Sequence, residues 1–431
     1  MDARSRHGAF TRSVATGILY ATRATCSAGS CPISTSGSVS SGTEDTSSGA
    51  APPAPPALPV ERLRAVAEAF EIPGRWVASR RWGSGWINDT VLAEFDEGGR
   101  RTRWIQQRIN AGVFRNPAHV MENIARVTEH QRRALERRGA ADAQRRALRL
   151  VAARDGGNAY VDADGAWWRS FQFIEGADTR DAVGSPAEAG AAAEAFARFL
   201  ADLADLPAPR LHETIPHFHD ARARLGQLHA AAAADAHGRL AGCRREFDAA
   251  LAHEPLVAKL EAMLASGALP ERVSHNDTKI NNVLLDAVSG EGVCVIDLDT
   301  VMPGTALYDF GDLARRAASP VAEDERDLSK VRVDPLLFEA LVAGWLHGAD
   351  GCLAEAERHE LVFASQLMTL VIGMRFLADH LSGDVYFRIQ RPGQNLDLAR
   401  TQLALLADFD RQRATLCAIG ERLAREASAR K

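Results

Sequence analysis

Residues 275–282 read His-Asn-Asp-Thr-Lys-Ile-Asn-Asn, and a hydrophobic run that ends in Val-Ile-Asp at 295–297 follows after one short turn. The first stretch contains a carboxylate, an ammonium group and an amide within six residues, namely Asp277, Lys279 and Asn282. A further carboxylate, Asp297, ends the second stretch. Phosphoryl transfer from ATP requires side chains of these types at about these spacings.

The spacing assigns a role to each of these side chains. A kinase catalytic loop has the form His-x-Asp with an Asn five residues later, in which the Asp is the base and the Asn binds magnesium. Asp277 and Asn282 fit this form, and Lys279 is placed to reach a transferring phosphate. We therefore predict Asp277 and Lys279 as catalytic residues, and Asn282 and Asp297 as metal ligands. ATP and Mg²⁺ are the predicted cofactors.

The segments 283–285 and 293–296 are short apolar runs around a Ser-Gly-Glu-Gly turn, which predicts a β-hairpin. If Asp286 pairs with Val293, then Asn282 lies opposite Asp297, with Cβ atoms about 4.5–5.5 Å apart if they share a face. Two such oxygens suit Mg²⁺, which takes its other ligands from water and phosphate. The alternative is a buried polar hairpin end on a fold without activity.

Composition narrows the class of protein. The chain has 431 residues, 46% hydrophobic and 25% charged, which is typical of a globular protein with room for two lobes. A net charge of -5 and the lack of a basic stripe argue against a nucleic-acid partner. No apolar run approaches the roughly 18 residues of a membrane span. The six cysteines lack paired metal spacing, so we expect free thiols and a cytoplasmic location. The sequence does not determine the oligomeric state, and a monomer is the favoured one.

Residues 1–57 differ from the rest of the chain. They are rich in Ser, Thr, Ala and Gly and end in Ala-Pro-Pro-Ala-Pro-Pro, which predicts a disordered low-complexity extension. The first residues contain several Arg and few acids, a weak similarity to a transit peptide. Disorder, or a start codon assigned too far upstream, is the preferred interpretation, and we assign no function to this segment.

Residues 58–176 are predicted to form a small α+β lobe that binds nucleotide. Apolar residues at helical spacing after Pro59 indicate a lead-in helix, and Asn116-Pro117 is typical of a helix start. The predicted strands are 76–82, 86–95, 102–109, 148–152 and 167–174.

Residues 177–431 are predicted to form a larger, mainly helical lobe that contains the catalytic hairpin and binds the substrate. Its long Ala- and Leu-rich stretches are 187–205, 221–233, 353–381 and 395–427. The whole chain is thus predicted to have a two-lobed, protein-kinase-like α+β fold, with the ligand site in the cleft between the lobes.

Two segments of the smaller lobe are predicted to bind the nucleotide. Gly83, Ser84 and Gly85 form a strand-to-strand turn whose N–H groups can approach phosphates closely. Phe173 and Ile174 lead into a Glu-Gly turn, an interlobe hinge whose backbone can bind adenine. The alternatives are an ordinary glycine turn and a core strand. No Gly-Lys-Ser/Thr motif is present, so a P-loop enzyme is not supported.

The third strand lacks the Lys that kinases pair with a helix Glu. Either Gln107 or Arg108 can face the phosphates in its place, but not both, because alternate strand residues point to opposite faces. Arg108 can equally be a solvated surface residue. Glu122 is the candidate for the helix acid.

Asp309-Phe310-Gly311 spells the kinase metal-binding tripeptide but lies too far beyond Asn282. We expect Asp309 and Asp312 to brace the catalytic loop by hydrogen bonds, and His275 to brace it rather than carry a proton. Asp299 can either touch a second ion or support the structure.

These residues resemble the aminoglycoside phosphotransferase and choline kinase superfamily, and within it the N-acetylhexosamine 1-kinases. The stretches that carry the resemblance are 83–90, 104–123, 214–220, 274–315, 323–331 and 373–387, together spanning about residues 60–410. The last reads Gly-Met-Arg-Phe-Leu-Ala-Asp-His-Leu-Ser-Gly-Asp-Val-Tyr-Phe and is the most specific.

The resemblance implies ATP- and Mg²⁺-dependent phosphorylation of the anomeric C1 hydroxyl of N-acetylglucosamine or N-acetylgalactosamine. It also implies that Arg375 and Tyr386 help to form the sugar pocket. A paired structural Arg is the alternative for Arg375. The chain departs from these sugar kinases at Trp86, where they tend to have His, and this position bears on sugar selectivity.

Two other functions remain open at this point. One is a kinase for another small hydroxylated substrate, such as an aminoglycoside, choline or an amino alcohol. The other is a non-catalytic nucleotide-binding or scaffold protein, which only the missing third-strand Lys favours.

Overall fold

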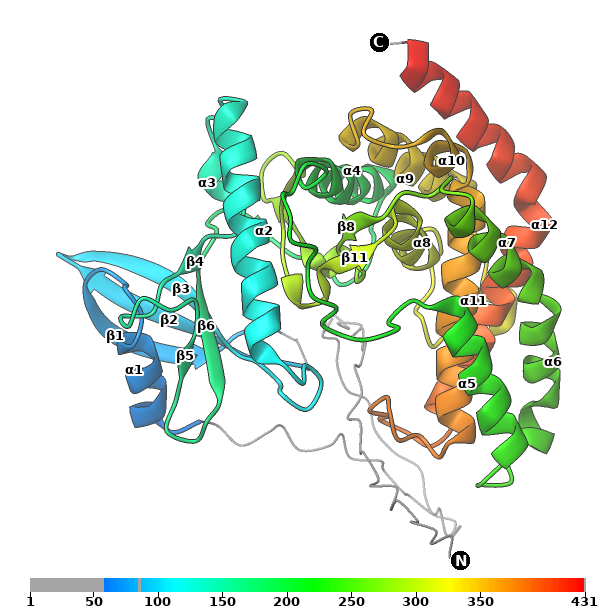
Figure 1. Ribbon diagram of the computed structural model, residues 1–431, viewed down its shortest axis with the longest axis horizontal. Coiled ribbons are helices and arrows are strands. Elements are labelled where there is room, and N and C mark those ends of the chain that lie inside the picture. The colour runs from blue at the N-terminus through cyan, green and yellow to red at the C-terminus, as the bar shows by residue number, and fades with distance from the viewer. Residues whose placement is uncertain (1–57, 84–86, 430–431) are drawn as a thin grey trace, which may run out of the picture.

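An antiparallel sheet forms the smaller lobe of this computed structural model, which describes residues 58–83 and 87–429 (Figure 1). Its strands lie in the order β1-β2-β3-β6-β4, with β5 paired to β6. Their bounds are Arg75–Arg81 (β1), Asp89–Glu97 (β2), Arg100–Arg108 (β3), Leu150–Val151 (β4), Tyr160–Val161 (β5) and Trp167–Gln172 (β6). The five predicted strands are confirmed, with shifted ends, and β5 was not predicted.

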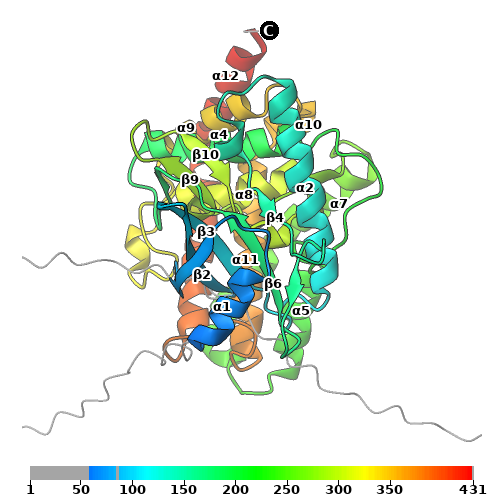
Figure 2. The ribbon, with the colours of Figure 1, turned by 90° about the vertical axis from the view of Figure 1, so that its left-hand side faces the viewer.

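The outer face of this sheet is covered by α1 (Val60–Glu68), the predicted lead-in helix (Figure 2). Its apolar side, with Val66 and Ala67, is buried in a cluster that includes Phe95 and Trp168 of the sheet. Burying an apolar side chain contributes about 1.5–3 kcal/mol, so the amphipathic pattern is what holds this helix to the lobe.

Helix α2 (Pro117–Arg137) stands between the sheet and the helical lobe (Figure 1). Asn116 caps it by accepting a hydrogen bond from the N–H of His119, and a Pro follows in the first turn, as predicted. The buried side chain of Asn123 donates to the carbonyls of His212 and Val301. This helix therefore binds directly to the larger lobe. The short helix α3 (Ala143–Arg146) follows it.

The larger lobe is mainly helical, as predicted. Its helices are α4 (Pro186–Asp202), α5 (Ala221–Ala234), α6 (Arg244–Ala252), α7 (Glu254–Ala265), α8 (Ala306–Ala317), α9 (Pro335–Gly348), α10 (Glu355–His359), α11 (Leu361–Leu381) and α12 (Gln394–Ala429). Four single 3₁₀ turns are η1 (Leu240–Cys243), η2 (Ile280–Asn282), η3 (Leu298–Thr300) and η4 (Leu328–Lys330).

Two expectations about this lobe need correction. The stretch 353–381 is two helices, because Glu360 leaves the helical conformation (φ -102°, ψ 25°) between α10 and α11. Helix α11 also has the length and hydropathy of a membrane span, which we did not expect of any segment. However, 94% of its apolar window is buried inside the protein, where it forms the centre of the lobe.

Two small sheets lie within the larger lobe. Strands β9 (Val283–Asp286) and β10 (Gly292–Val295) form the predicted hairpin, and β7 (Ala177–Asp178) pairs with β9. Strands β8 (Arg272–Ser274) and β11 (Met302–Gly304) form the second sheet. Together they present the catalytic loop, residues 275–282, between β8 and β9.

The predicted hairpin register is wrong by one residue at the open end of the hairpin and by two beside the turn. Val283 pairs with Val295, and the N–H of Ile296 donates to the carbonyl of Asn282. Ile296, and not Asp297, therefore lies opposite Asn282. An irregularity between Gly292 and Cys294 shifts the register.

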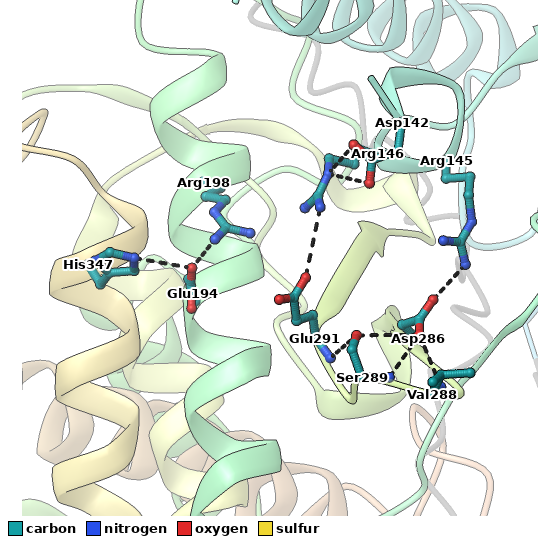
Figure 3. Close-up of polar contacts among 10 residues, drawn as sticks. All are labelled: Asp142, Arg145, Arg146, Glu194, Arg198, Asp286, Val288, Ser289, Glu291 and His347. Atoms are coloured by element: carbon teal, nitrogen blue, oxygen red, sulfur yellow. Dashed lines mark hydrogen bonds and ion pairs between the residues drawn. The ribbon is translucent and has the colours of Figure 1, made fainter. Parts of the chain in front are cut away.

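Local contacts at the turn explain this register. The Asp286 carboxylate accepts hydrogen bonds from the N–H groups of Val288 and Ser289, and the Asp286 N–H donates to the carbonyl of Glu291 (Figure 3). Gly292 then packs against α4, where a Cβ atom would lie 2.6 Å from the carbonyl oxygen of Ala191. The side-chain cap and this close approach fix the strand ends.

Arg145 ties the hairpin to the segment that joins the lobes. Its Nη2 donates to Asp286 at 2.9 Å (Figure 3). The same nitrogen donates to the carbonyl of Glu175 at 3.0 Å. One guanidinium group thus fixes the interlobe hinge against the hairpin that carries the catalytic loop.

Candidate active site

Two carboxylates of helix α8 hold the catalytic loop by hydrogen bonds. The carboxylate of Asp309 accepts the N–H groups of His275 (2.9 Å) and Asn276 (2.7 Å), and Asp312 accepts the N–H of Thr278 (3.1 Å). Burial raises the pKa of Asp309 to about 7, against the opposing effect of these two hydrogen bonds. Asp309 and Asp312 therefore brace the loop, as expected.

His275 is a second brace. It is fully buried, its Nε2 donates to the carbonyl of Ile296 (3.0 Å), and its Nδ1 accepts the N–H of Asp277 (3.3 Å). Burial lowers the pKa of His275, so the ring stays neutral. Both nitrogens are engaged with the backbone, and the ring positions the loop rather than carrying a proton.

The four predicted catalytic and metal-binding side chains lie at one place. Asn282 Nδ2 donates to the carbonyl of Asp277 (2.9 Å) and to its Oδ2 (3.1 Å). Lys279 Nζ lies 3.0 Å from Asp277 Oδ2 and 3.9 Å from Asp297 Oδ2. Asp297 has a left-handed backbone conformation (φ 61°), which turns the chain out of β10 and directs its carboxylate toward Lys279. The side chains meet although the predicted register is wrong.

Each of the two predicted metal ligands has an oxygen that can reach an ion. The Asn282 side-chain nitrogen donates to Asp277. The amide oxygen of Asn282 has no hydrogen-bond partner among the described residues. The Asp297 carboxylate contacts Lys279, and 31% of the side chain remains accessible. Burial raises the pKa of Asp297 to about 6, with Lys279 opposing. One carboxylate oxygen and one amide oxygen are ligands of the kind that Mg²⁺ takes, so these residues fit the ion.

The predicted phosphate loop is only partly described. Gly83 follows β1 with a positive φ of 74°, a conformation that favours glycine. Ser84, Gly85 and Trp86 lie outside the described residues.

The predicted hinge follows β6. The Phe173 ring packs edge-on against Trp82, with the Arg103 guanidinium 4.1 Å from its centroid. Ile174 is buried against the β9–β10 hairpin. Neither its N–H nor its carbonyl has a partner among the described residues. The segment thus has the free backbone groups that an adenine ring requires.

Strand β3 places both third-strand candidates, Gln107 and Arg108. Gln107 lies on the side of β3 that contacts Arg169, where Nε2 donates to Thr90 (3.1 Å) and Oε1 accepts from Arg169 (2.9 Å). Arg108 pairs with Asp89, its cross-strand neighbour.

The suggestion that Glu122 is the helix acid is wrong. Its carboxylate is 49% exposed and bonds His212 at 2.8 Å.

Arg169 is the functional candidate that the sequence analysis missed. It is 1% exposed and forms an ion pair with Asp299, which also accepts a hydrogen bond from Asn88 Nδ2 (2.5 Å). These contacts support the structural interpretation of Asp299. The sequence signal for Arg169 was a charged residue among the aromatic residues of β6. Its partner Asp299 lies 130 residues further along the chain, so the sequence did not reveal the pair.

The predicted sugar-binding residues also lie together. Arg375 Nη2 donates to the hydroxyl of Tyr386 (3.3 Å), and its guanidinium lies 5.0 Å from the centroid of Phe218 and 5.5 Å from that of Phe387. Arg375 is thus a buried cation (8% exposed) in an aromatic setting.

Asp379 holds the segment that carries Tyr386. Its carboxylate accepts the N–H groups of Val385, Tyr386 and Phe387 at 2.7–3.0 Å and the side-chain amide of Asn395 at 2.8 Å. The three backbone bonds fix the 385–387 segment and the fourth orients the carboxylate, so Asp379 positions the tyrosine beside Arg375.

Comparison with known proteins identifies the family. The model of the phosphotransferase enzyme family matches residues 79–355, well over half of the chain. The chain belongs to this family. As a member of the phosphotransferase family it is a small-molecule phosphotransferase with an alcohol acceptor, on the kinase-like fold described above.

Several solved structures are similar to this phosphotransferase. An aminoglycoside phosphotransferase from Alicyclobacillus acidocaldarius is 16% identical (TM-score 0.48, covering 88% of this chain and 98% of that chain). A choline kinase from Cryptosporidium parvum is 12% identical (TM-score 0.48, 82% and 96%). A choline/ethanolamine kinase family protein from Mesorhizobium loti is 19% identical (TM-score 0.44, 83% and 99%).

Proposed function

We propose that the chain is an ATP- and Mg²⁺-dependent kinase that phosphorylates the anomeric C1 hydroxyl of an N-acetylhexosamine. N-Acetylglucosamine and N-acetylgalactosamine are the proposed substrates, and the sugar 1-phosphate is the product. The observation that carries the kinase reaction is the contact of Lys279 with both Asp277 and Asp297, beside Asn282. The family supplies the reaction class. The nucleotide, the ion and the sugar are what the proposal adds.

Asp277 is the proposed base. Its carboxylate accepts the proton of the C1 hydroxyl while the sugar oxygen forms a bond to the γ-phosphorus and the bond from that phosphorus to ADP breaks. An anomeric hydroxyl is more acidic than an ordinary alcohol, which lowers the demand on the base. Asn282 fixes the carboxylate by its hydrogen bond to Oδ2 (3.1 Å).

Lys279 is placed to stabilise the transferred phosphoryl group, because its ammonium lies between the base and the predicted metal ligand. Asn282 and Asp297 would hold Mg²⁺, which when bound neutralises charge on the phosphate oxygens. The hinge at Ile174 would bind adenine through its two free backbone groups.

Arg375 favours a neutral acceptor. It lies close enough to Arg224 to help lower the pKa of that residue to about 10, an effect caused mainly by burial. It is also close to His219, whose Nε2 donates to the carbonyl of Asn276 beside Asp277. The buried Arg375 and the partly buried Arg224 give this part of the proposed sugar pocket two positive charges, which disfavour a cationic acceptor such as choline, an amino alcohol or an aminoglycoside. A sugar hydroxyl or N-acetyl carbonyl can instead accept a hydrogen bond from the guanidinium.

A parallel acceptor panel tests the proposal. ADP release with Mg-ATP is followed by a coupled assay on N-acetylglucosamine, N-acetylgalactosamine, choline and kanamycin. We expect kcat/KM to be at least tenfold higher for one of the two hexosamines than for either cation. Higher activity on choline or kanamycin would assign a cationic acceptor, and no activity on any hexosamine would refute the sugar assignment.

A further inference from the structure

Arg169 is a charged side chain that the proposed reaction does not use. Its side chain is 1% exposed, and the carboxylate of its partner Asp299 is 3% exposed. Removing two charges from water costs several kcal/mol per ion, which only good geometry and further hydrogen bonds offset. A pair of apolar side chains would fill the same space without that cost, so the pair requires an explanation beyond stability.

The pair joins the two lobes. Arg169 lies on β6 of the smaller lobe, whereas Asp299 lies on η3 of the larger lobe, two residues after the predicted metal ligand Asp297. Thr214 Oγ1 donates to the backbone carbonyl of Asp299 at 2.8 Å. Both the backbone and the side chain of the turn that follows Asp297 are therefore fixed.

A chain of hydrogen bonds orients the guanidinium. Thr90 accepts from Gln107 Nε2 (3.1 Å), and Gln107 Oε1 accepts from Arg169 Nε (2.9 Å). Arg169 Nη1 then donates to one Asp299 oxygen, and the other accepts from Asn88 (2.5 Å). Both ends of this chain lie at the start of β2, just after the predicted phosphate loop.

The third-strand position explains why Arg169 is needed. Kinases place a Lys there and pair it with a helix Glu, and that pair must form for activity. Here the third strand has Gln107, which bonds Arg169, and Glu122 of α2 bonds His212 instead. The neighbouring strand supplies the cation: Arg169 lies directly opposite Gln107 in the β3–β6 ladder.

We propose that the Arg169–Asp299 pair replaces the kinase Lys–Glu pair and positions the metal-binding turn at Asp297 against the smaller lobe. Arg169 is a positioning residue, because it acts on the metal ligand through Asp299. This inference rests on the proposed function, since it assumes that a magnesium–nucleotide complex binds between the lobes.

Nucleotide binding measured by calorimetry tests the pair without any acceptor. ADP is titrated into the full chain with Mg²⁺ and, separately, with EDTA. Arg169→Met keeps the length of the side chain but removes the charge. We expect it to weaken Mg-ADP binding at least tenfold and to change Mg-free ADP binding less than threefold. Arg169→Lys keeps the charge but loses the planar guanidinium that bonds Asp299 and Gln107 from separate nitrogens, so it should give an intermediate loss.

Two further variants separate positioning from folding. Arg108→Met removes the other Arg–Asp pair of the β3 region and should bind Mg-ADP as the wild type does. Arg169→Met with Asp299→Asn leaves no unpaired buried charge, so it serves if the single variant does not fold. We expect this double variant also to lose at least tenfold in Mg-ADP affinity.

Three results would overturn the inference. They are Mg-ADP binding within twofold of the wild type in the charge-free variants, a loss of equal size without Mg²⁺, and an equal loss in Arg108→Met. Failure of the proposed function gives a different result. A wild-type chain that binds Mg-ADP but phosphorylates no hexosamine contradicts the sugar assignment alone, and one that binds no Mg-ADP contradicts both.

Discussion

Replacement of Asp277 by Asn removes the proposed base with little change in shape. Asp277 is 4% exposed, and its Oδ2 contacts Asn282 Nδ2 at 3.1 Å and Lys279 Nζ at 3.0 Å. The amide oxygen of the substituted side chain can still accept from Asn282, so the loop keeps its hydrogen bond. The variant loses the negative charge beside Lys279 and the ability to accept a proton.

The expected loss follows from the role of the base. A positioned base contributes about 10²–10⁴ in rate, which corresponds to roughly 3–5.5 kcal/mol of activation free energy. We therefore expect kcat for the hexosamine to fall at least a hundredfold in Asp277→Asn. Mg-ADP affinity should stay within about threefold, because Asn282 and Asp297 are unchanged.

The coupled ADP assay measures kcat, and calorimetry measures nucleotide affinity. Asp155→Asn, on an exposed turn of the smaller lobe, is the matched control and should leave both quantities unchanged. Activity of Asp277→Asn above one tenth of the wild-type value would refute the assignment of the base. Loss of both nucleotide binding and activity would show instead that the Asp277 carboxylate maintains the structure of the site.

Three further predictions concern residues around the site. Asp309→Ala leaves two buried backbone N–H groups of the catalytic loop unpaired, so urea denaturation should show a free energy of unfolding lower by about 2–5 kcal/mol; no change would contradict the bracing role. Burial lowers the pKa of His219 to about 4, so the unfolded state takes up the proton first. The free energy of unfolding should therefore fall as pH drops from 6.5 to 4, by up to about 3 kcal/mol from this group; His219→Gln should remove this part and the exposed His359→Gln should not. Asp379→Ala should raise KM for the sugar at least fivefold and leave KM for ATP within twofold, because it releases the segment that carries Tyr386; an equal effect on both would count against a pocket role.

The sequence predicted the catalytic loop and the hairpin because their signals are local. The spacing of Asp277 and Asn282 and the apolar runs on either side of a Gly-rich turn need no knowledge of distant residues. The predicted register was wrong because the true one depends on a contact outside the hairpin and on a side-chain cap within the turn. Gly292 packs against the backbone of α4, and the turn is capped by Asp286.

The sequence analysis also missed Arg169, the buried cation of the smaller lobe, because its role depends on distant residues. Strand β3 contains no Lys, and only the pairing of β3 with β6 brings Arg169 opposite Gln107. The sequence analysis did not predict the helix break at Glu360, because the Leu- and Ala-containing pattern continues on both sides of this residue. Arg272, which is far away in the sequence, donates a hydrogen bond to Glu357. This contact holds α10 in place separately from α11.

The product of the reaction tests the central claim most directly. The purified chain is incubated with Mg-ATP and N-acetylglucosamine or N-acetylgalactosamine, and the product is examined by ³¹P NMR with proton coupling. We predict a phosphomonoester resonance coupled to the anomeric proton, which requires Mg²⁺ and is absent with Asp277→Asn. A phosphate on any other sugar carbon, or the same product from the Asp277→Asn chain, would contradict the account.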